Sequence, residues 1–293
     1  MIKGSIVALI TPFLNNKVNY EKLEELLDFH LENKTDGLLL LGTTAESSTL
    51  SEQECHEIVT YCTNYIHNRI DIIVGICTND TNKAINDCIY YEKQGITNFL
   101  VITPYYNKSN DSGVYKHFKE ISNNISSNII IYHIPNRTGL TLNLSLIKKL
   151  SEIKNIAGIK EANENFRDSL NLFSLQNENF KIYCGNDDFS IPFLALGADG
   201  LINVCGNVFP KEFHDMYELY KSNEIQNSLE IFNKYKNIIN AVFLETNPIG
   251  IKEIMYILSM NNNELRLPLD NMSEENSNIL KKELLNIGNN IIY

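Results

Sequence analysis

The amino-acid sequence predicts an α/β protein, a TIM (β/α)8 barrel followed by a C-terminal helical appendage. Short apolar, β-branched runs recur about every 20 to 35 residues, and the stretches between them show helical periodicity. Eight such runs are present, and eight parallel strands alternating with helices make this barrel. A doubly wound open sheet is the alternative, but neither a dinucleotide-binding Gly-x-Gly-x-x-Gly nor a P-loop sequence follows any run.

Each element has its own signal. The expected strands are Ser5–Ile10, Gly37–Leu41, Ile70–Gly75, Asn98–Ile102, Asn128–Tyr132, Ile156–Ile159, Lys181–Cys184 and Gly200–Val204. Among the helices between them, Ser51 followed by Glu52-Gln53-Glu54 reads as an N-cap with an acidic first turn. Asn143 is the expected N-cap of the helical segment that ends near Leu150.

The pattern changes after Val204, because no further strand run follows. Helical segments are expected at Phe213–Tyr220, Ile225–Leu244, Ile249–Met260 and Glu274–Ile287, with the eighth barrel helix over Lys211–Lys221. Pro248 and Pro268 are expected at helix boundaries. We therefore predict a catalytic barrel domain over residues 1–222 and a helical domain over residues 223–293.

Composition narrows the function. The 293 residues carry a formal net charge of −11, which disfavours nucleic acid and anionic membranes as partners. The apolar runs are far shorter than the roughly 20 residues of a membrane span, and Met1-Ile2-Lys3 leads directly into a strand, so we expect a cytoplasmic protein. The six cysteines and six histidines lack metal-site spacing. We expect reduced thiols, no metal and no cofactor.

Lys160 is the strongest candidate for catalysis, because active-site residues of such a barrel lie at the C-terminal ends of its strands. An amine that is partly desolvated there has a lowered pKa, and the neutral form attacks a ketone or aldehyde to form a Schiff base. The structural alternative is a solvated lysine paired with the neighbouring Glu161.

Other strand ends supply polar groups. Tyr132 ends the adjacent strand and is placed to transfer protons, and Tyr106 and Thr43 extend it into a hydroxyl relay. Thr43 and Thr44 follow Gly42 on a turn expected to lead into a helix N-terminus, where a carboxylate binds well. The Arg137 guanidinium suits a second carboxylate. The alternatives are a buried tyrosine hydroxyl for Tyr132 and a loop ion pair for Arg137.

Five motifs occur in order along the chain: Gly42-Thr43-Thr44-Ala45-Glu46, Pro104-Tyr105-Tyr106-Asn107-Lys108, Tyr132-x-x-Pro135-x-Arg137-Thr138-Gly139, Gly158-Ile159-Lys160-Glu161-Ala162 and Asn247-Pro248…Lys252. Together they resemble the pyruvate-dependent class I aldolase and lyase superfamily, and within it the dihydrodipicolinate synthase family, over essentially the whole chain. The resemblance implies a lyase that condenses pyruvate with L-aspartate-4-semialdehyde to 4-hydroxy-tetrahydrodipicolinate, the first step of the diaminopimelate branch of lysine biosynthesis. A neuraminate lyase, a 2-keto-3-deoxy sugar acid aldolase and a catalytically idle small-acid-binding barrel are the alternatives.

The resemblance also implies roles for single residues. Lys160 would form the imine with pyruvate, and Thr43, Tyr132 and Tyr106 would relay protons. Thr44 would bind the pyruvate carboxylate, Arg137 would bind the semialdehyde carboxylate, and Gly185 and Ile202 would present carbonyls. Tyr106 would cross into the active site of a neighbouring subunit, which implies a homodimer or homotetramer.

The chain departs from the family pattern at His133, Ser109, Asn186 and Gly250, and at the pair Asn163-Glu164 that follows Lys160-Glu161-Ala162. Positions that resemble the family's site for lysine inhibition are Ser47, Ser48, Glu52, Cys55, Asn79, Lys83 and Tyr105. Lysine-sensitive members generally carry an acid where Lys83 stands. Since a lysine ligand would meet a like charge there, weak or absent inhibition is expected.

Overall fold

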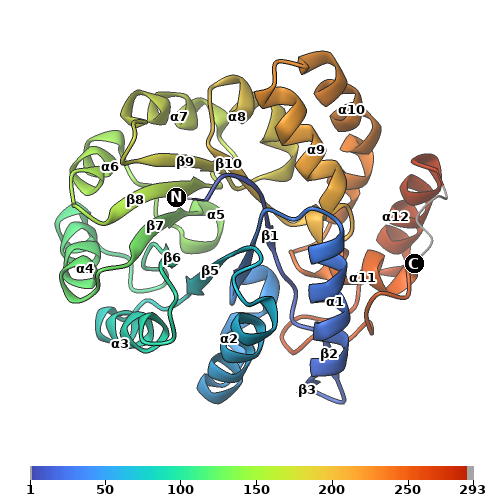
Figure 1. Ribbon diagram of the computed structural model, residues 1–293, viewed down its shortest axis with the longest axis horizontal. Helices are drawn as coiled ribbons and strands as arrows, with labels where there is room; N and C mark the ends of the chain where they lie inside the picture. Colours follow the sequence, from blue (N-terminus) through green and yellow to red (C-terminus); the bar gives the residue numbers. More distant parts are fainter. Residues whose placement is uncertain (1, 289–293) are drawn as a thin grey trace. The chain divides into compact units, whose positions relative to one another are not determined.

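A computed structural model describes residues 2–288 and confirms the predicted fold class (Figure 1). Eight strands form a closed parallel barrel in the order β1-β10-β9-β8-β7-β6-β5-β4. Their bounds are β1 Gly4–Ala8, β4 Gly37–Leu40, β5 Asp71–Ile76, β6 Asn98–Ile102, β7 Asn128–His133, β8 Ile156–Glu161, β9 Lys181–Cys184 and β10 Gly200–Asn203. Every predicted strand is present, with its ends within one or two residues of the expected ones.

Helices fill the intervals between the strands and follow the last one. They are α1 Tyr20–Glu32, α2 Glu52–Ile66, α3 Thr81–Glu92, α4 Asp111–Asn124, α5 Pro135–Thr138, α6 Leu144–Ser151, α7 Phe166–Leu170, α8 Ser190–Ala195, α9 Pro210–Lys221, α10 Ile225–Val242, α11 Ile249–Ile257 and α12 Glu274–Asn286. Both predicted N-caps are confirmed: Ser51 forms a full capping box with Glu54, and the Asn143 side chain accepts a hydrogen bond from Leu146 N. No helix within residues 2–288 is long and apolar enough to cross a membrane.

Two local features differ from the sequence-based expectation. A small antiparallel hairpin of β2 Phe13–Leu14 and β3 Lys17–Val18 was not expected, because two-residue strands leave no periodic pattern. Pro268 lies inside the connection between α11 and α12 rather than at a helix boundary, whereas Pro248 directly precedes α11 as predicted.

The chain divides into two compact units. One comprises Ile72–Ile202 together with the residues before Gly4, and the other comprises Gly4–Asp71 together with the chain from Asn203 onward. Helices α10–α12 thus belong to the same unit as β1 and β4. The boundary between residues 222 and 223 stays a prediction.

Each unit has a core built on parallel strands. In the Ile72–Ile202 unit, β6 pairs with β7 and β7 with β8, the second pair with a register shift between Ile129 and Ile130, and Ile129, Ile130 and Ile131 are fully buried. In the other unit, β1 pairs with β4 so that Ile6 lies opposite Gly37. Strands buried on both faces read as continuous apolar runs, which is why the sequence located them well.

Candidate active site

Lys160 lies within β8 and not just beyond it, because the strand continues to Glu161. Tyr132 is its register partner on β7, and both side chains therefore point to the same side of the sheet. Lys160 is 4% exposed, and its Nζ lies 4.6 Å from the centre of the Tyr132 ring. The structure thus brings together the predicted nucleophile and the predicted proton-transfer residue.

Burial lowers the pKa of Lys160 to about 8, from an ordinary value of 10.5. The Asp187 carboxylate opposes this shift and the Arg137 guanidinium adds to it. At pH 7 about 10% of an amine with this pKa is neutral, compared with about 0.03% of an unperturbed lysine. Lys160 therefore has the nucleophilic form available at neutral pH.

Gly185, which follows β9, allows the chain to pass close to Lys160. A Cβ atom at this position would lie 3.0 Å from Lys160 Cε and 2.8 Å from the Glu161 carbonyl oxygen. A side chain at position 185 would therefore collide with Lys160 and Glu161, which gives Gly185 a steric role in addition to the expected role of the Gly185 carbonyl. Ile202 lies on the neighbouring β10 and is fully buried.

Two further predicted residues of this unit are exposed. Arg137 lies in the last turn of the short helix α5 and faces solvent. Tyr106 is 92% exposed and has a positive φ of 65°, an uncommon conformation for a bulky residue. The structure thus presents Tyr106 to solvent.

Thr43 and Thr44 belong to the other unit and lie on a single 3-10 turn, η1 Thr43–Ala45. Gly42 is the N-cap of this turn, so Thr43 and Thr44 stand at the start of a 3-10 helix rather than of an α-helix, and a second 3-10 turn, η2 Ser47–Thr49, separates them from α2. Glu46, between the two turns, adopts a left-handed conformation that redirects the chain. Thr44 is buried, and its Oγ1 accepts a hydrogen bond of 3.0 Å from Asn247 Nδ2.

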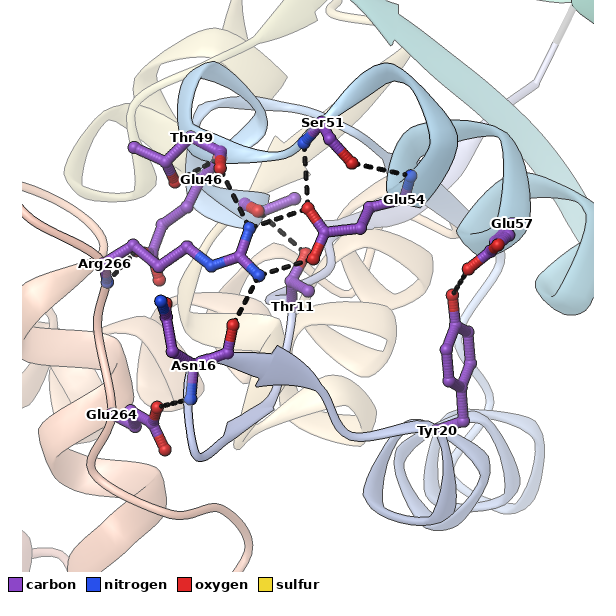
Figure 2. Close-up of polar contacts among 11 residues, drawn as sticks. Thr11, Asn16, Tyr20, Glu46, Thr49, Ser51, Glu54, Glu57, Glu264 and Arg266 are labelled. Atoms are coloured by element: carbon purple, nitrogen blue, oxygen red, sulfur yellow. Dashed lines mark hydrogen bonds and ion pairs between the residues drawn. The ribbon is translucent and has the colours of Figure 1, made fainter.

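A buried charge network that was not predicted from the sequence follows this turn, and Figure 2 shows its part around Glu46, Arg266 and Glu54. The Lys252 ammonium on α11 is paired with the Glu46 carboxylate, and their side chains are 0% and 1% exposed. Glu46 also accepts a hydrogen bond of 2.9 Å from Arg266 N. The Phe13 ring of β2 lies 4.2 Å from Lys252 Nζ, so the hairpin contributes an aromatic face to this network.

Arg266 extends the network to the start of α2. Figure 2 shows its guanidinium between Glu54, Thr49 and Asn16, with hydrogen bonds of 2.8 Å to Glu54 Oε2 and 2.9 Å to the Thr49 carbonyl. The Arg266 guanidinium holds the pKa of Glu54 at about 2. Glu46 and Lys252 each belong to one of the five motifs quoted above, but those motifs do not identify the two side chains as partners, and Arg266 lies outside them.

The alternative pairing of Lys160 with Glu161 does not form. Glu161 is turned to the opposite side of β8 and is bonded to His133 on β7, with His133 Nδ1 2.8 Å from Glu161 Oε2. Side chains of successive strand residues point to opposite faces, so Lys160 and Glu161 cannot share a pocket.

The predicted inhibitor positions are divided between the two units. Asn79, Lys83 and Tyr105 belong to one, where Asn79 Nδ2 donates to the Tyr105 carbonyl over 3.1 Å and Lys83 Nζ lies 3.0 Å from Asp87 Oδ1. Ser47, Ser48, Glu52 and Cys55 belong to the other. Within the part of the chain that the structure describes, no group of three or more His, Cys, Asp or Glu could hold a metal ion.

A family model, curated relatives and solved structures all match this chain over nearly its full length. The model of the "Dihydrodipicolinate synthetase family" matches residues 1–287. A relative named 4-hydroxy-tetrahydrodipicolinate synthase, from Clostridium tetani, is 43% identical over 287 residues and 98% of each chain. The crystal structure of dihydrodipicolinate synthase from Aquifex aeolicus has a TM-score of 0.93 at 37% identity and covers 97% of each chain.

A second solved structure, described as the first monomeric dihydrodipicolinate synthase variant, has a TM-score of 0.95 at 36% identity. It covers 98% of this chain and 97% of its own. The family match, the identities and the structural likeness therefore all point to one assignment: the chain belongs to the dihydrodipicolinate synthetase family.

Proposed function

We propose that this protein is a 4-hydroxy-tetrahydrodipicolinate synthase that condenses pyruvate with L-aspartate-4-semialdehyde through a Schiff base on Lys160. The buried Lys160, with a pKa lowered to about 8 beside Tyr132, is the observation that carries the proposal. The names of the full-length relatives support the same reaction. This condensation is the first step of the diaminopimelate branch of lysine biosynthesis.

In the proposed reaction, the neutral Lys160 amine attacks the ketone carbon of pyruvate, and loss of water from the carbinolamine gives a protonated imine. Removal of a methyl proton gives the enamine, whose carbon bonds to the aldehyde carbon of the semialdehyde. The substrate's own amine then attacks the imine carbon, closes the ring and releases Lys160. The Tyr132 hydroxyl is the proposed proton donor and acceptor at Lys160, since the two side chains are register partners.

The remaining residues serve binding and proton relay. Thr44 is proposed to hold the pyruvate carboxylate and Arg137 that of the semialdehyde, because an exposed guanidinium offers a forked contact to a carboxylate. The carbonyls of Gly185 and Ile202 are proposed to face the imine and the second substrate. Thr43 and Tyr106 are proposed to complete the relay with Tyr132.

The protein is proposed to act in the cytoplasm as a homodimer or homotetramer. The outward Tyr106, 92% exposed with a positive φ, supports a role in the active site of a neighbouring subunit. A dihydrodipicolinate synthase variant described as monomeric shows that assembly has to be measured. Sedimentation of the protein alongside its turnover at the same concentrations tests this point.

Lysine is proposed to be a weak inhibitor of this enzyme or none at all. Lys83 is exposed and paired with Asp87, so a lysine ligand near it would meet a like charge. A millimolar or tighter inhibition constant for lysine at neutral pH would contradict this part of the proposal.

Borohydride reduction in the presence of pyruvate, followed by peptide mass mapping, tests the imine. We expect a single adduct on Lys160, and full turnover with Lys160 unmodified would refute the proposed chemistry. Turnover with aspartate-4-semialdehyde then tests the acceptor. Imine formation combined with activity only on neuraminate or a keto-deoxy sugar acid would support the aldolase alternative.

Arg137→Ala tests the acceptor site directly. We expect a large rise in KM for the semialdehyde with little change in imine formation from pyruvate. Arg167→Ala is a matched control, because Arg167 is an exposed arginine on α7 of the same unit. Equal effects of the two substitutions would exclude Arg137 as the carboxylate-binding residue.

A further inference from the structure

His133 and Glu161 form a buried pair that follows the Lys160–Tyr132 pair by one residue along β7 and β8. The two strands place His133 opposite Glu161, one step beyond Tyr132 and Lys160. The His133 and Glu161 side chains are 3% and 2% exposed, and His133 Nδ1 lies 3.0 and 2.8 Å from the two carboxylate oxygens. Because side chains alternate along a strand, this pair lies on the opposite side of the sheet from Lys160.

The hydrogen bonds define which ring nitrogen of His133 carries the proton. Leu142 N lies 3.1 Å from His133 Nε2, and a backbone N–H can only donate. Nε2 is therefore the acceptor, and the proton of the neutral ring is on Nδ1, from which it is donated to Glu161. Both nitrogens of the buried imidazole are used.

The contact with Leu142 closes the loop that carries Arg137. His133 is the last residue of β7, and Leu142 lies nine residues further along, beyond the four-residue helix α5. Local bonds from Thr138 and Gly139 to the carbonyls of Ile134 and Pro135 shape the turn itself. The imidazole anchors the far end of this loop to the strand from which it starts.

Glu161 connects this loop to the one that follows Lys160. Its Oε1 accepts a hydrogen bond of 2.9 Å from Asn163 N, the second residue beyond β8. The Ala162 N–H donates to the His133 carbonyl over 2.9 Å. The ends of β7 and β8 and both following loops are therefore joined through one neutral imidazole and one carboxylate.

We propose that His133 is a positioning residue that holds the Arg137 loop, through its contact with Leu142, for the carboxylate of the second substrate, and that its bond to Glu161 stabilises the fold. The inference rests on the proposed function, since it assigns Arg137 to that carboxylate. A forked guanidinium contact depends on its geometry, so loosening the loop weakens recognition of the semialdehyde. Imine formation depends on Lys160 and Tyr132, on the other face of the strands, and is preserved.

Two substitutions separate the two contacts of the ring. In His133→Asn the amide nitrogen takes the place of Nδ1 and still donates to Glu161, but the side chain is too short to accept from Leu142 N. In His133→Gln the amide oxygen reaches the place of Nε2 and keeps the Leu142 contact while losing the donation to Glu161. The measurements are borohydride trapping with pyruvate, KM for each substrate and kcat, and urea unfolding.

For His133→Asn we expect KM for aspartate-4-semialdehyde to rise about tenfold, as for one lost hydrogen bond, with trapping of the pyruvate imine unchanged. His133→Gln should keep the wild-type KM and lose stability instead. In an Arg137→Ala background, His133→Asn should add little to KM, because the loop then has no guanidinium to position.

An unchanged KM in His133→Asn, an effect that adds in full to that of Arg137→Ala, or an equal loss of imine trapping would overturn the inference. If His133→Asn does not fold, a tenfold rise of KM in His133→Gln overturns it and a wild-type value supports it. A wild-type protein that traps pyruvate but does not consume the semialdehyde overturns the proposed function instead.

Discussion

Lys252→Met offers the clearest test of the buried charge network around Glu46. The Lys252 and Glu46 side chains are 0% and 1% exposed, and the ammonium also donates to the Glu264 carbonyl over 3.0 Å. Burial lowers the pKa of Lys252, and the Glu46 carboxylate beside it opposes that shift. Met has a similar volume without the charge, so the substitution leaves Glu46 buried with the Arg266 N–H as its remaining donor among the contacts described above.

The expected cost is that of an uncompensated buried carboxylate. Removing one partner of a buried ion pair destabilises a protein by about 3–5 kcal/mol, whereas replacing both partners is often close to neutral. We therefore expect Lys252→Met to lower the free energy of unfolding by about 3–5 kcal/mol, and Lys252→Met with Glu46→Gln to recover most of it.

The assay is urea unfolding at equal protein concentration, since assembly would change the apparent stability. Lys211→Met is the matched control, because Lys211 pairs with Asp215 on the surface of α9 and its side chain is 55% exposed. A surface pair of this kind contributes at most about 1 kcal/mol. If Lys252→Met costs no more than the control, or if the double substitution costs more than Lys252→Met alone, the argument from burial fails.

Three further predictions follow from burial and exposure. Because the pKa of Lys160 is about 8, trapping of the pyruvate imine should rise between about pH 6 and 9 with its midpoint near pH 8, and a flat profile would contradict the shifted amine. His30 is fully buried and bonded to Thr35, and burial lowers its pKa to about 3. As the pH falls, His30 is protonated in the unfolded chain near pH 6.5 but in the folded chain only near pH 3. The stability that comes from keeping His30 neutral is therefore complete above about pH 6.5, and up to about 5 kcal/mol of it is lost as the pH falls toward 3. Urea unfolding of His30→Leu should show a weaker acid dependence, and an unchanged one would exclude His30 as its source. Tyr106→Phe removes the hydroxyl proposed for the relay and should cut turnover strongly without changing pyruvate imine formation. Stability should not change, because Tyr106 is 92% exposed. Unchanged turnover in steady-state kinetics would remove Tyr106 from the relay.

The fold and the reactive amine were accessible from the sequence because their signals are local. All eight barrel strands were predicted from continuous apolar runs, and the N-caps Ser51 and Asn143 from residue type and spacing. Lys160 was found because it ends an apolar run, and five motifs in order gave the family. Each of these inferences uses residues within one element or its immediate neighbours.

The partners of the buried charged side chains, and the pKa of Lys160, could be read only from the folded structure. The sequence offered Glu161 as the neighbour of Lys160, but strand alternation turns it to His133, and Leu142 then sets the protonation of that ring. Glu46 meets Lys252 from 206 positions away, a distance over which no spacing rule operates. Residue types and their periodicity are determined by sequence, whereas the depth of burial that moves the pKa of Lys160, and the partner that each buried charge receives, depend on which distant segments pack together.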